Sequence, residues 1–335
     1  MVLRALKIIF IFFAVLIVLS AAYYPAIASR YVYHDDVVYF LTTPTKLEPP
    51  GTVFNVAIGR FFGANLFILL GLLVKNISDL NTIRFLSVVQ LSLCGFFFIL
   101  WSRKYFLSLR DSFFIAVAVF TLPPFQIMVS QAGMGFQPAG VLLAILSAIL
   151  VFEAPPEGPW LKRFFNKNIL FSILLFISAT CIYQPSAMFF WSMLGFILLF
   201  SAVPFDQLRN RIFHFGFVAA ISFGVYAAIL YQTKKYFASY NLWSYNPYSL
   251  TTDYFGKIKW FFGEPLSSAL NLWNVFPKML AAYFVGIFIC GAIVLRLLRV
   301  RKEKDITYGR LFFIFMVLFL LLFAAFLPNL ASENN

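Results

Sequence analysis

The chain has 335 residues, of which 62% are apolar and 20% aromatic, and 45 of them are phenylalanines. Only 12% are charged, about half the fraction usual in soluble domains, and the mean hydropathy is +0.87. These values exclude a soluble globular enzyme, a disordered chain and a fibrous repeat. The apolar segments are continuous and do not alternate with polar residues, which argues against a β-barrel. The sequence therefore predicts an all-α, polytopic membrane helical bundle.

The charge balance sets 26 Lys and Arg against 13 Asp and Glu, a net charge of +13. In a soluble protein this surplus would suggest nucleic acid, but in a membrane chain basic residues hold loops in the cytosol. We therefore expect membrane lipids as partners and no nucleic acid. Cys94, Cys181 and Cys290 lie in apolar runs without metal-ligand spacing, so no metal is expected.

Nine apolar runs have about the length of a membrane-spanning helix. They cover residues 5–27, 83–101, 112–131, 138–153, 169–183, 186–203, 213–232, 277–297 and 310–329. A tenth run, Phe61 to Val74, is shorter than a normal span. Pro123-Pro124 and Pro185 suggest broken helices, which kink a span or open a lateral entrance for lipid. We expect one transmembrane domain over residues 1–335.

Basic residues indicate which connections face the cytosol. They gather in five short segments: Arg4 and Lys7; Arg103, Lys104 and Arg110; Lys162, Arg163 and Lys167; Arg209 and Arg211; and Arg296, Arg299, Arg301, Lys302, Lys304 and Arg310. All five fall on one side only if residues 61–74 do not cross. The predicted topology therefore has nine crossings, an inner N-terminus, an outer C-terminus and a helix in the outer leaflet at 61–74. Ten crossings would instead place His34 in the cytosol.

The first apolar run has two interpretations. Its basic start, apolar core and Ala26-Ile27-Ala28 resemble a signal peptide with a cleavage site. The apolar stretch is long for a signal peptide, and the segments that follow are membranous as well. An uncleaved first helix is the prediction that we keep.

Two longer segments, about 28–82 and 233–276, are predicted to lie outside. The first contains the adjacent acids Asp35 and Asp36 among aromatic residues. Two neighbouring carboxylates beside a low-dielectric region resist simultaneous ionisation, which suits one of them to act as a general base. The alternative is a solvated loop in which one of them caps a helix starting at Val37. His34 is either part of this chemistry or an interfacial histidine.

Cationic candidates follow in both outer segments. Pro49-Pro50-Gly51 breaks the chain before a new helix, on which Arg60 enters the apolar run 61–74. Arg60 could bind a lipid-linked phosphate with two hydrogen bonds, or extend to lipid headgroups. Lys257 and Lys259 lie among aromatic residues in the second outer segment, as in an interfacial amphipathic piece.

Three short motifs in this order resemble a known family. The Asp35-Asp36 pair after the first span, then Gly59-Arg60, then Tyr183-Gln184 between two mid-chain spans resemble the GT-C superfamily of integral-membrane glycosyltransferases. Within it, they are most similar to the Gtr-type O-antigen glucosyltransferases of bacteria. Members usually continue beyond the last span found here, whereas this chain ends at Ala331 to Asn335, so a C-terminal truncation stays open.

The resemblance implies a fold, a reaction and a place in the cell. It implies a GT-C bundle in the bacterial inner membrane, with its active site on the periplasmic face. There a hexose, expected to be glucose, would move with inversion from a polyprenyl-phosphate donor to a cell-surface glycan such as O-antigen, a lipopolysaccharide modification. The implied reaction needs no cofactor.

The resemblance also implies roles for residues. Asp35 or Asp36 would be the base, and Arg60 would bind the donor phosphate, with Lys257 and Lys259 as further cations. His34, Tyr183, Gln184 and Glu264 are candidate contacts to sugar or acceptor. The main alternative is a flippase or transporter of lipid-linked saccharide without catalytic activity, and a noncatalytic membrane scaffold is a third interpretation.

Overall fold

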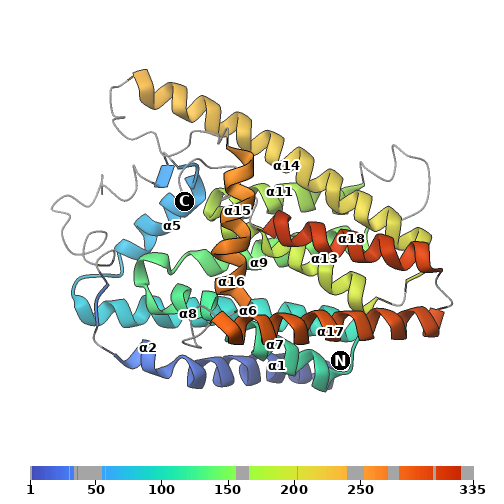
Figure 1. The fold of residues 1–335 in the computed structure, drawn as a ribbon. Helices are drawn as coiled ribbons and strands as arrows, with labels where there is room; N and C mark the ends of the chain where they lie inside the picture. Colours follow the sequence, from blue (N-terminus) through green and yellow to red (C-terminus); the bar gives the residue numbers. More distant parts are fainter. Residues whose placement is uncertain are drawn as a thin grey trace. The chain divides into compact units, whose positions relative to one another are not determined.

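The computed structural model describes residues 2–29, 31–33, 36, 55–56, 58–155, 166–201, 203–239, 253–270, 279–304 and 307–325. Within these ranges the chain is helical apart from short turns and contains no strand, so the prediction of an all-α protein is confirmed. Contacts divide the chain into a first unit, residues 1–190 with 210–244, and a second unit, residues 191–209 with 245–335. Figure 1 shows the order of the helices.

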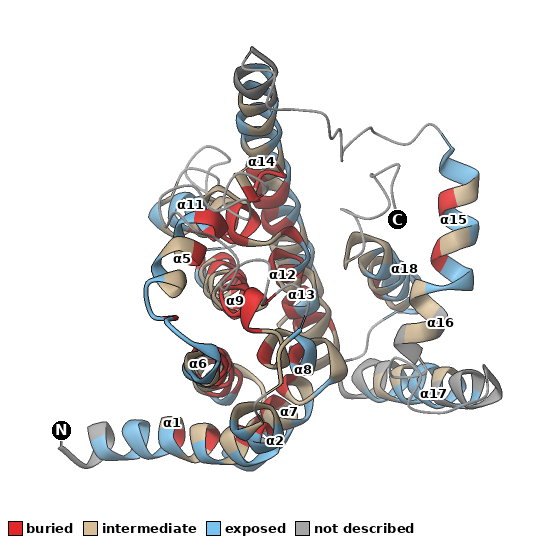
Figure 2. Cartoon of the chain, turned by 90° about the vertical axis from the view of Figure 1, so that its left-hand side faces the viewer, coloured by how far each residue is buried: buried red, intermediate tan, exposed pale blue. Residues whose placement is uncertain are grey.

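The first unit is built around α6, α9 and α11. Its helices are α1 (Val2–Ala22), α2 (Tyr24–Ala28), α5 (Phe61–Gly71), α6 (Leu80–Tyr105), α7 (Leu109–Phe120), α8 (Pro123–Ser130), α9 (Gln137–Glu153), α11 (Lys167–Ile182), α12 (Gln184–Ala187) and most of α14 (Phe205–Ser239), with short 3₁₀ turns η2 (Ile77–Asp79) and η3 (Ala132–Met134). Helix α9 packs between α6 and α11, and α1 and α7 lie against α6. Buried residues gather on α6, α9 and α12, as Figure 2 shows.

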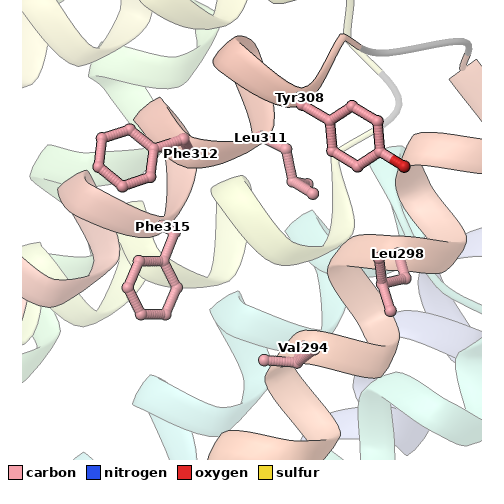
Figure 3. Close-up of a pocket in the computed structure, with 6 residues that line it drawn as sticks. All are labelled: Val294, Leu298, Tyr308, Leu311, Phe312 and Phe315. Atoms are coloured by element: carbon pink, nitrogen blue, oxygen red, sulfur yellow. The ribbon is translucent and has the colours of Figure 1, made fainter.

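The second unit contains α13 (Phe189–Phe200), which begins in the first unit, the start of α14, and α15 (Tyr254–Gly263), α16 (Pro265–Leu270), α17 (Met279–Lys304) and α18 (Tyr308–Ala325). Phe261 is fully buried against Phe323, with ring centroids 4.9 Å apart. A groove of about 370 Å³ runs between α17 and α18 (Figure 3). Its lining is apolar except for the Tyr308 hydroxyl: Val294, Leu298, Tyr308, Leu311, Phe312 and Phe315.

Four described helical segments are long and apolar enough to cross a membrane: Ile77–Tyr105, Ala132–Glu153, Phe205–Thr233 and Tyr308–Ala325. A fifth forms if α7 and α8 are one span, bent by 61°. The break falls at Pro123-Pro124, as predicted, because proline cannot continue the preceding helix. These helices indicate a membrane protein. Nine crossings, and one transmembrane domain over residues 1–335, stay predictions.

Helix α5 covers most of the tenth apolar run and is short. Its 11 residues, at 1.5 Å each, extend about 16 Å, roughly half the thickness of the hydrocarbon core of a bilayer. This length agrees with the prediction that the run does not cross the membrane. The side of the membrane on which it lies stays a prediction.

Local sequence fixes several helix starts in the first unit. Asn76 accepts a hydrogen bond from the Ser78 backbone N–H, and the Asp79 carboxylate accepts one from the Asn76 N–H, which forms a capping box before α6. Ser108 accepts from the Asp111 N–H at the start of α7, and Asn166 caps α11 in the same way. These caps set where α6, α7 and α11 begin.

Candidate functional site

Arg60 lies at the start of α5 rather than inside a continuous helix. A turn at Ile58 and Gly59 precedes it, and Gly59 has φ +81°, a backbone conformation that favours glycine. A side chain at Gly59 would also collide with the Tyr226 hydroxyl. Arg60 is therefore the N-cap residue of α5. The prediction that Arg60 sits within the helix entering the apolar run is wrong, because the left-handed glycine interrupts that helix.

The Gly59-Arg60 and Tyr183-Gln184 motifs meet in space. The Arg60 guanidinium lies over the Tyr183 ring, 4.4 Å from its centroid, and its Nε donates to Gln184 Oε1 at 3.4 Å. The Gln184 amide in turn donates to the Ile58 carbonyl at 2.8 Å and to the Tyr226 hydroxyl. Four residues thus form one cluster, the Arg60 cluster: Arg60, Tyr183, Gln184 and Tyr226.

A helix break presents Tyr183 and Gln184 to Arg60. Helix α11 ends at Ile182, Tyr183 is extended with φ −161° and ψ 114°, and α12 starts at Gln184 with Pro185 following. Proline fits the first turn of a helix but not its interior, so α11 cannot run on into α12. This break, which the sequence predicts from Pro185, turns the ring and the amide toward the start of α5.

The Arg60 cluster leaves the arginine without a negative partner. Among the residues that the structure describes, no carboxylate lies within ion-pair distance of Arg60. Its printed contacts are an aromatic face and an amide oxygen, both neutral. Arg60 is half-buried, and it stands where the N–H groups of α5 point outward and favour an anion. The cluster can therefore bind an anion such as a phosphate.

Asp36 is in a different situation, because its carboxylate is fully buried. Its Oδ1 accepts from the Gly133 N–H at 2.7 Å, and its Oδ2 accepts from the Tyr33 N–H and from Arg84 Nη2, both at 3.3 Å. A solvated loop, one of the two interpretations of the acidic pair, is wrong for Asp36. The buried ion pair explains why a carboxylate can lie here without water.

Arg84, on α6, uses all five of its N–H donors. Its Nε donates to the Ser130 carbonyl, Nη1 to the Ser29 carbonyl and the Asn81 side chain, and Nη2 to the Tyr31 carbonyl and Asp36. The Tyr31 ring covers the guanidinium at 4.2 Å. Burial raises the pKa of the Tyr31 hydroxyl, which donates to the Ser130 carbonyl at 3.2 Å. Arg84 and its hydrogen-bond partners, the Arg84 network, thus hold Ser29, Tyr31 and Asp36 against α6 and residues 130–133.

These contacts bear on the chemical role of Asp36. Asp36 is fully buried and both of its oxygens already accept hydrogen bonds, so an acceptor hydroxyl does not reach it in this structure. Asp35 and His34 lie outside the described residues. Their assignments as base and as sugar contact stay predictions.

One loop supports both the Arg60 cluster and the Arg84 network. At η3, Ala132 packs in a buried cluster with Leu80 and Ile83 of α6. Four residues on, Phe136 packs with Phe67 of α5 and Ile182 of α11, beside Tyr183. Leu70 of α5 touches both clusters. The two sets of polar residues therefore rest on a common apolar layer.

The remaining predicted residues belong to the second unit. Lys257 on α15 is buried and its ammonium lies 5.1 Å from the Trp260 ring centroid, whereas Lys259 is exposed. Glu264, at the end of α15, accepts from Trp260 Nε1 at 3.0 Å. Their proposed contacts to a donor phosphate or a sugar stay predictions.

Sequence reasoning missed Arg84 and Tyr226. Arg84 was detectable, since an ionisable residue inside an apolar run marks a functional or paired position, and Asp36 is among the few acids able to pair with it. Tyr226 carries no such signal, because one tyrosine within the run 213–232 resembles any other span residue. Its role depends on Gly59 lying beside it.

Among the described residues no group of three His, Cys, Asp or Glu side chains could hold a metal ion. Comparison of the chain with family models, with curated proteins and with solved structures finds no match. The residues themselves therefore carry the functional argument.

Proposed function

We propose that the protein is an inverting GT-C type glycosyltransferase of the bacterial inner membrane. It moves a hexose, glucose in the simplest case, from a polyprenyl-phosphate donor to a cell-surface glycan such as O-antigen on the periplasmic face. The observation that carries this proposal is the Arg60 cluster. It joins two motifs of the resemblance, 124 residues apart, around an arginine with no described carboxylate partner.

In this proposal Arg60 binds the phosphate that links sugar to lipid. A guanidinium offers planar, paired donors that match phosphate oxygens. The Tyr183 ring and the Gln184 amide orient the plane of the Arg60 guanidinium, so the Arg60 side chain loses little conformational freedom when it binds the phosphate. Negative charge grows on the phosphate as the glycosidic bond breaks, and a cation placed beforehand lowers the barrier.

Asp35 is the proposed general base and Asp36 is the residue that positions it. An acceptor hydroxyl oxygen attacks the anomeric carbon while the bond from that carbon to the phosphate oxygen breaks. The hydroxyl proton passes to the Asp35 carboxylate, and the polyprenyl phosphate leaves with the bonding electrons. Asp36, fixed by Arg84 and the Gly133 N–H, anchors the segment that carries Asp35.

The direct test is transfer of sugar by the purified protein in detergent or liposomes. Polyprenyl-phosphate glucose is supplied with the surface glycan, and the glycosylated product is measured. Asp35→Asn should lower the rate by about 10² to 10⁴ while donor binding persists. A protein that moves the donor across liposomes without forming product, and does so equally well as Asp35→Asn, would instead be the flippase.

A further inference from the structure

Arg211 on α14 has a guanidinium whose charge is not matched within the described part of the chain. Its plane lies over the Phe152 ring, 3.9 Å from the centroid, near the end of α9. Two of its three nitrogens, Nε and Nη1, are buried and have no hydrogen-bond partner. The residue as a whole is half-buried, so part of its side chain is open to solvent.

Unpaired buried N–H groups on a charged side chain are costly. Losing water without gaining a partner costs about 1–3 kcal/mol for a neutral group and more for a charged one. Arg84 in the same unit shows the usual solution, with five donors and five acceptors. Within the described residues Arg211 lacks such acceptors, so a further acceptor would be strongly favoured.

The carboxylate of Glu153, next to Phe152 in the chain, already has a cationic partner. Glu153 follows Phe152 at the end of α9, and its Oε1 accepts from Lys104 Nζ at 2.9 Å and from the Tyr105 hydroxyl at 2.8 Å. The Tyr105 ring also packs on Phe152, with centroids 5.0 Å apart. With Glu153 neutralised by Lys104, no described carboxylate compensates the charge of Arg211.

The Phe152 ring, on which Arg211 lies, packs in a cluster of aromatic rings. The rings of Trp101 and Phe106 pack on Phe152 with centroids 5.5 and 5.3 Å away. They come from the end of α6 and the residue after it, where Arg103 and Lys104 are exposed cations. The surroundings of Arg211 thus combine closely packed aromatic rings beside its guanidinium with further positive charge at the end of α6.

We propose that Arg211 is a binding site for a phosphate oxyanion, held by its half-buried guanidinium. The site lies among the ends of α6, α9 and α14. The ends of α6 and α14 carry residues of two of the basic segments predicted to face the cytosol, which gives the headgroup of an anionic phospholipid of the inner leaflet access to Arg211. Inorganic phosphate offers the same oxygens. The site does not depend on the proposed glycosyltransferase activity.

The experiment measures ligand-induced stabilisation of the full chain purified in detergent. The unfolding temperature is recorded during titration with phosphatidylglycerol, phosphatidylcholine or inorganic phosphate. We expect phosphatidylglycerol to raise it in the wild type, phosphatidylcholine to have little effect, and Arg211→Gln to weaken the apparent affinity for phosphatidylglycerol about tenfold. Arg110→Gln is the matched control, since Arg110 is an exposed cation whose guanidinium lies 5.8 Å from the Phe114 ring centroid.

The outcomes distinguish the sources of the oxyanion. An equal effect of inorganic phosphate would identify a free oxyanion site, and an effect of phosphatidylglycerol alone would identify a headgroup site. Equal responses of wild type and Arg211→Gln, or no response of the wild type to any anion, would overturn the proposal. If Arg211→Gln does not fold, Arg211→Lys, which keeps the charge but loses donors, must show the weaker affinity, and an unchanged affinity would equally overturn it.

Discussion

Arg84 and Arg60 are both in the first unit, but their side chains differ in burial and in the charge of their partners. Arg84 is fully buried and saturated by backbone carbonyls, an amide and a carboxylate. Arg60 is half-buried, and its partners are neutral. The first arrangement holds a fold together, and the second is open to an anion. The two arginines should therefore respond differently to mutation.

Arg84→Gln is expected to destabilise the protein by about 3–5 kcal/mol, because Asp36 would stay buried without its counter-charge. The measurement is thermal unfolding in detergent. Lys104→Gln is the matched control: it breaks an ion pair whose side chains are 60% and 32% exposed, and such pairs contribute about 0–1 kcal/mol. Adding Asp36→Asn to Arg84→Gln should restore part of the lost stability. Equal stability of the two single variants would contradict a structural role for the Arg84 network.

Arg60→Ala should weaken donor binding by about 2–5 kcal/mol if a buried, charge-assisted phosphate contact is lost, with little loss of stability. Arg60→Lys keeps the charge but not the planar pair of donors, so it should fall between alanine and wild type. Titration with polyprenyl-phosphate glucose measures the donor affinity of both variants. Unchanged affinity and turnover in the two variants would reduce Arg60 to a headgroup contact.

At the scale of elements, the turn before α5 determines where Arg60 points. Gly59→Ala should be destabilising, because alanine disfavours φ +81° and its Cβ would collide with Tyr226. We expect a lower unfolding temperature together with weaker donor binding. Gly216→Ala on α14 is the control, since no atom lies within 4 Å of its added Cβ. A Gly59→Ala variant that behaves like Gly216→Ala would show that the turn does not hold Arg60.

The sequence predicts the helices far better than the side-chain partnerships. Each of the nine apolar runs overlaps a described helix or pair of helices, and the breaks at Pro123-Pro124 and Pro185 follow from the missing N–H of proline. The position of Arg60 outside its helix could not be foreseen, because a left-handed glycine has no signature of its own. The pairing of Asp36 with Arg84, 48 residues away, depends on packing that periodicity does not encode.

At the scale of the whole molecule, the basic segments predict how the chain crosses the membrane. Residues His34 and Tyr245, both outside the described ranges, should face the periplasm, and Lys302 should face the cytosol. Single cysteines at these positions, in a background with Cys94, Cys181 and Cys290 replaced by serine, are treated with an impermeant thiol reagent in intact cells. We expect labelling at 34 and 245 alone. Labelling at position 302 without labelling at position 34 would contradict the predicted topology.

In the proposed mechanism one carboxylate, Asp35, takes the proton of the acceptor hydroxyl during sugar transfer, and its neighbour Asp36 holds the segment in place. The most direct measurement compares product formation from purified polyprenyl-phosphate glucose by wild type, Asp35→Asn and Asp36→Asn, with donor affinity and unfolding temperature recorded for each. We predict that Asp35→Asn loses about 10² to 10⁴ in rate at unchanged stability, and that Asp36→Asn keeps partial activity but unfolds at a lower temperature. Transfer at the wild-type rate by both variants would contradict the glycosyltransferase proposal.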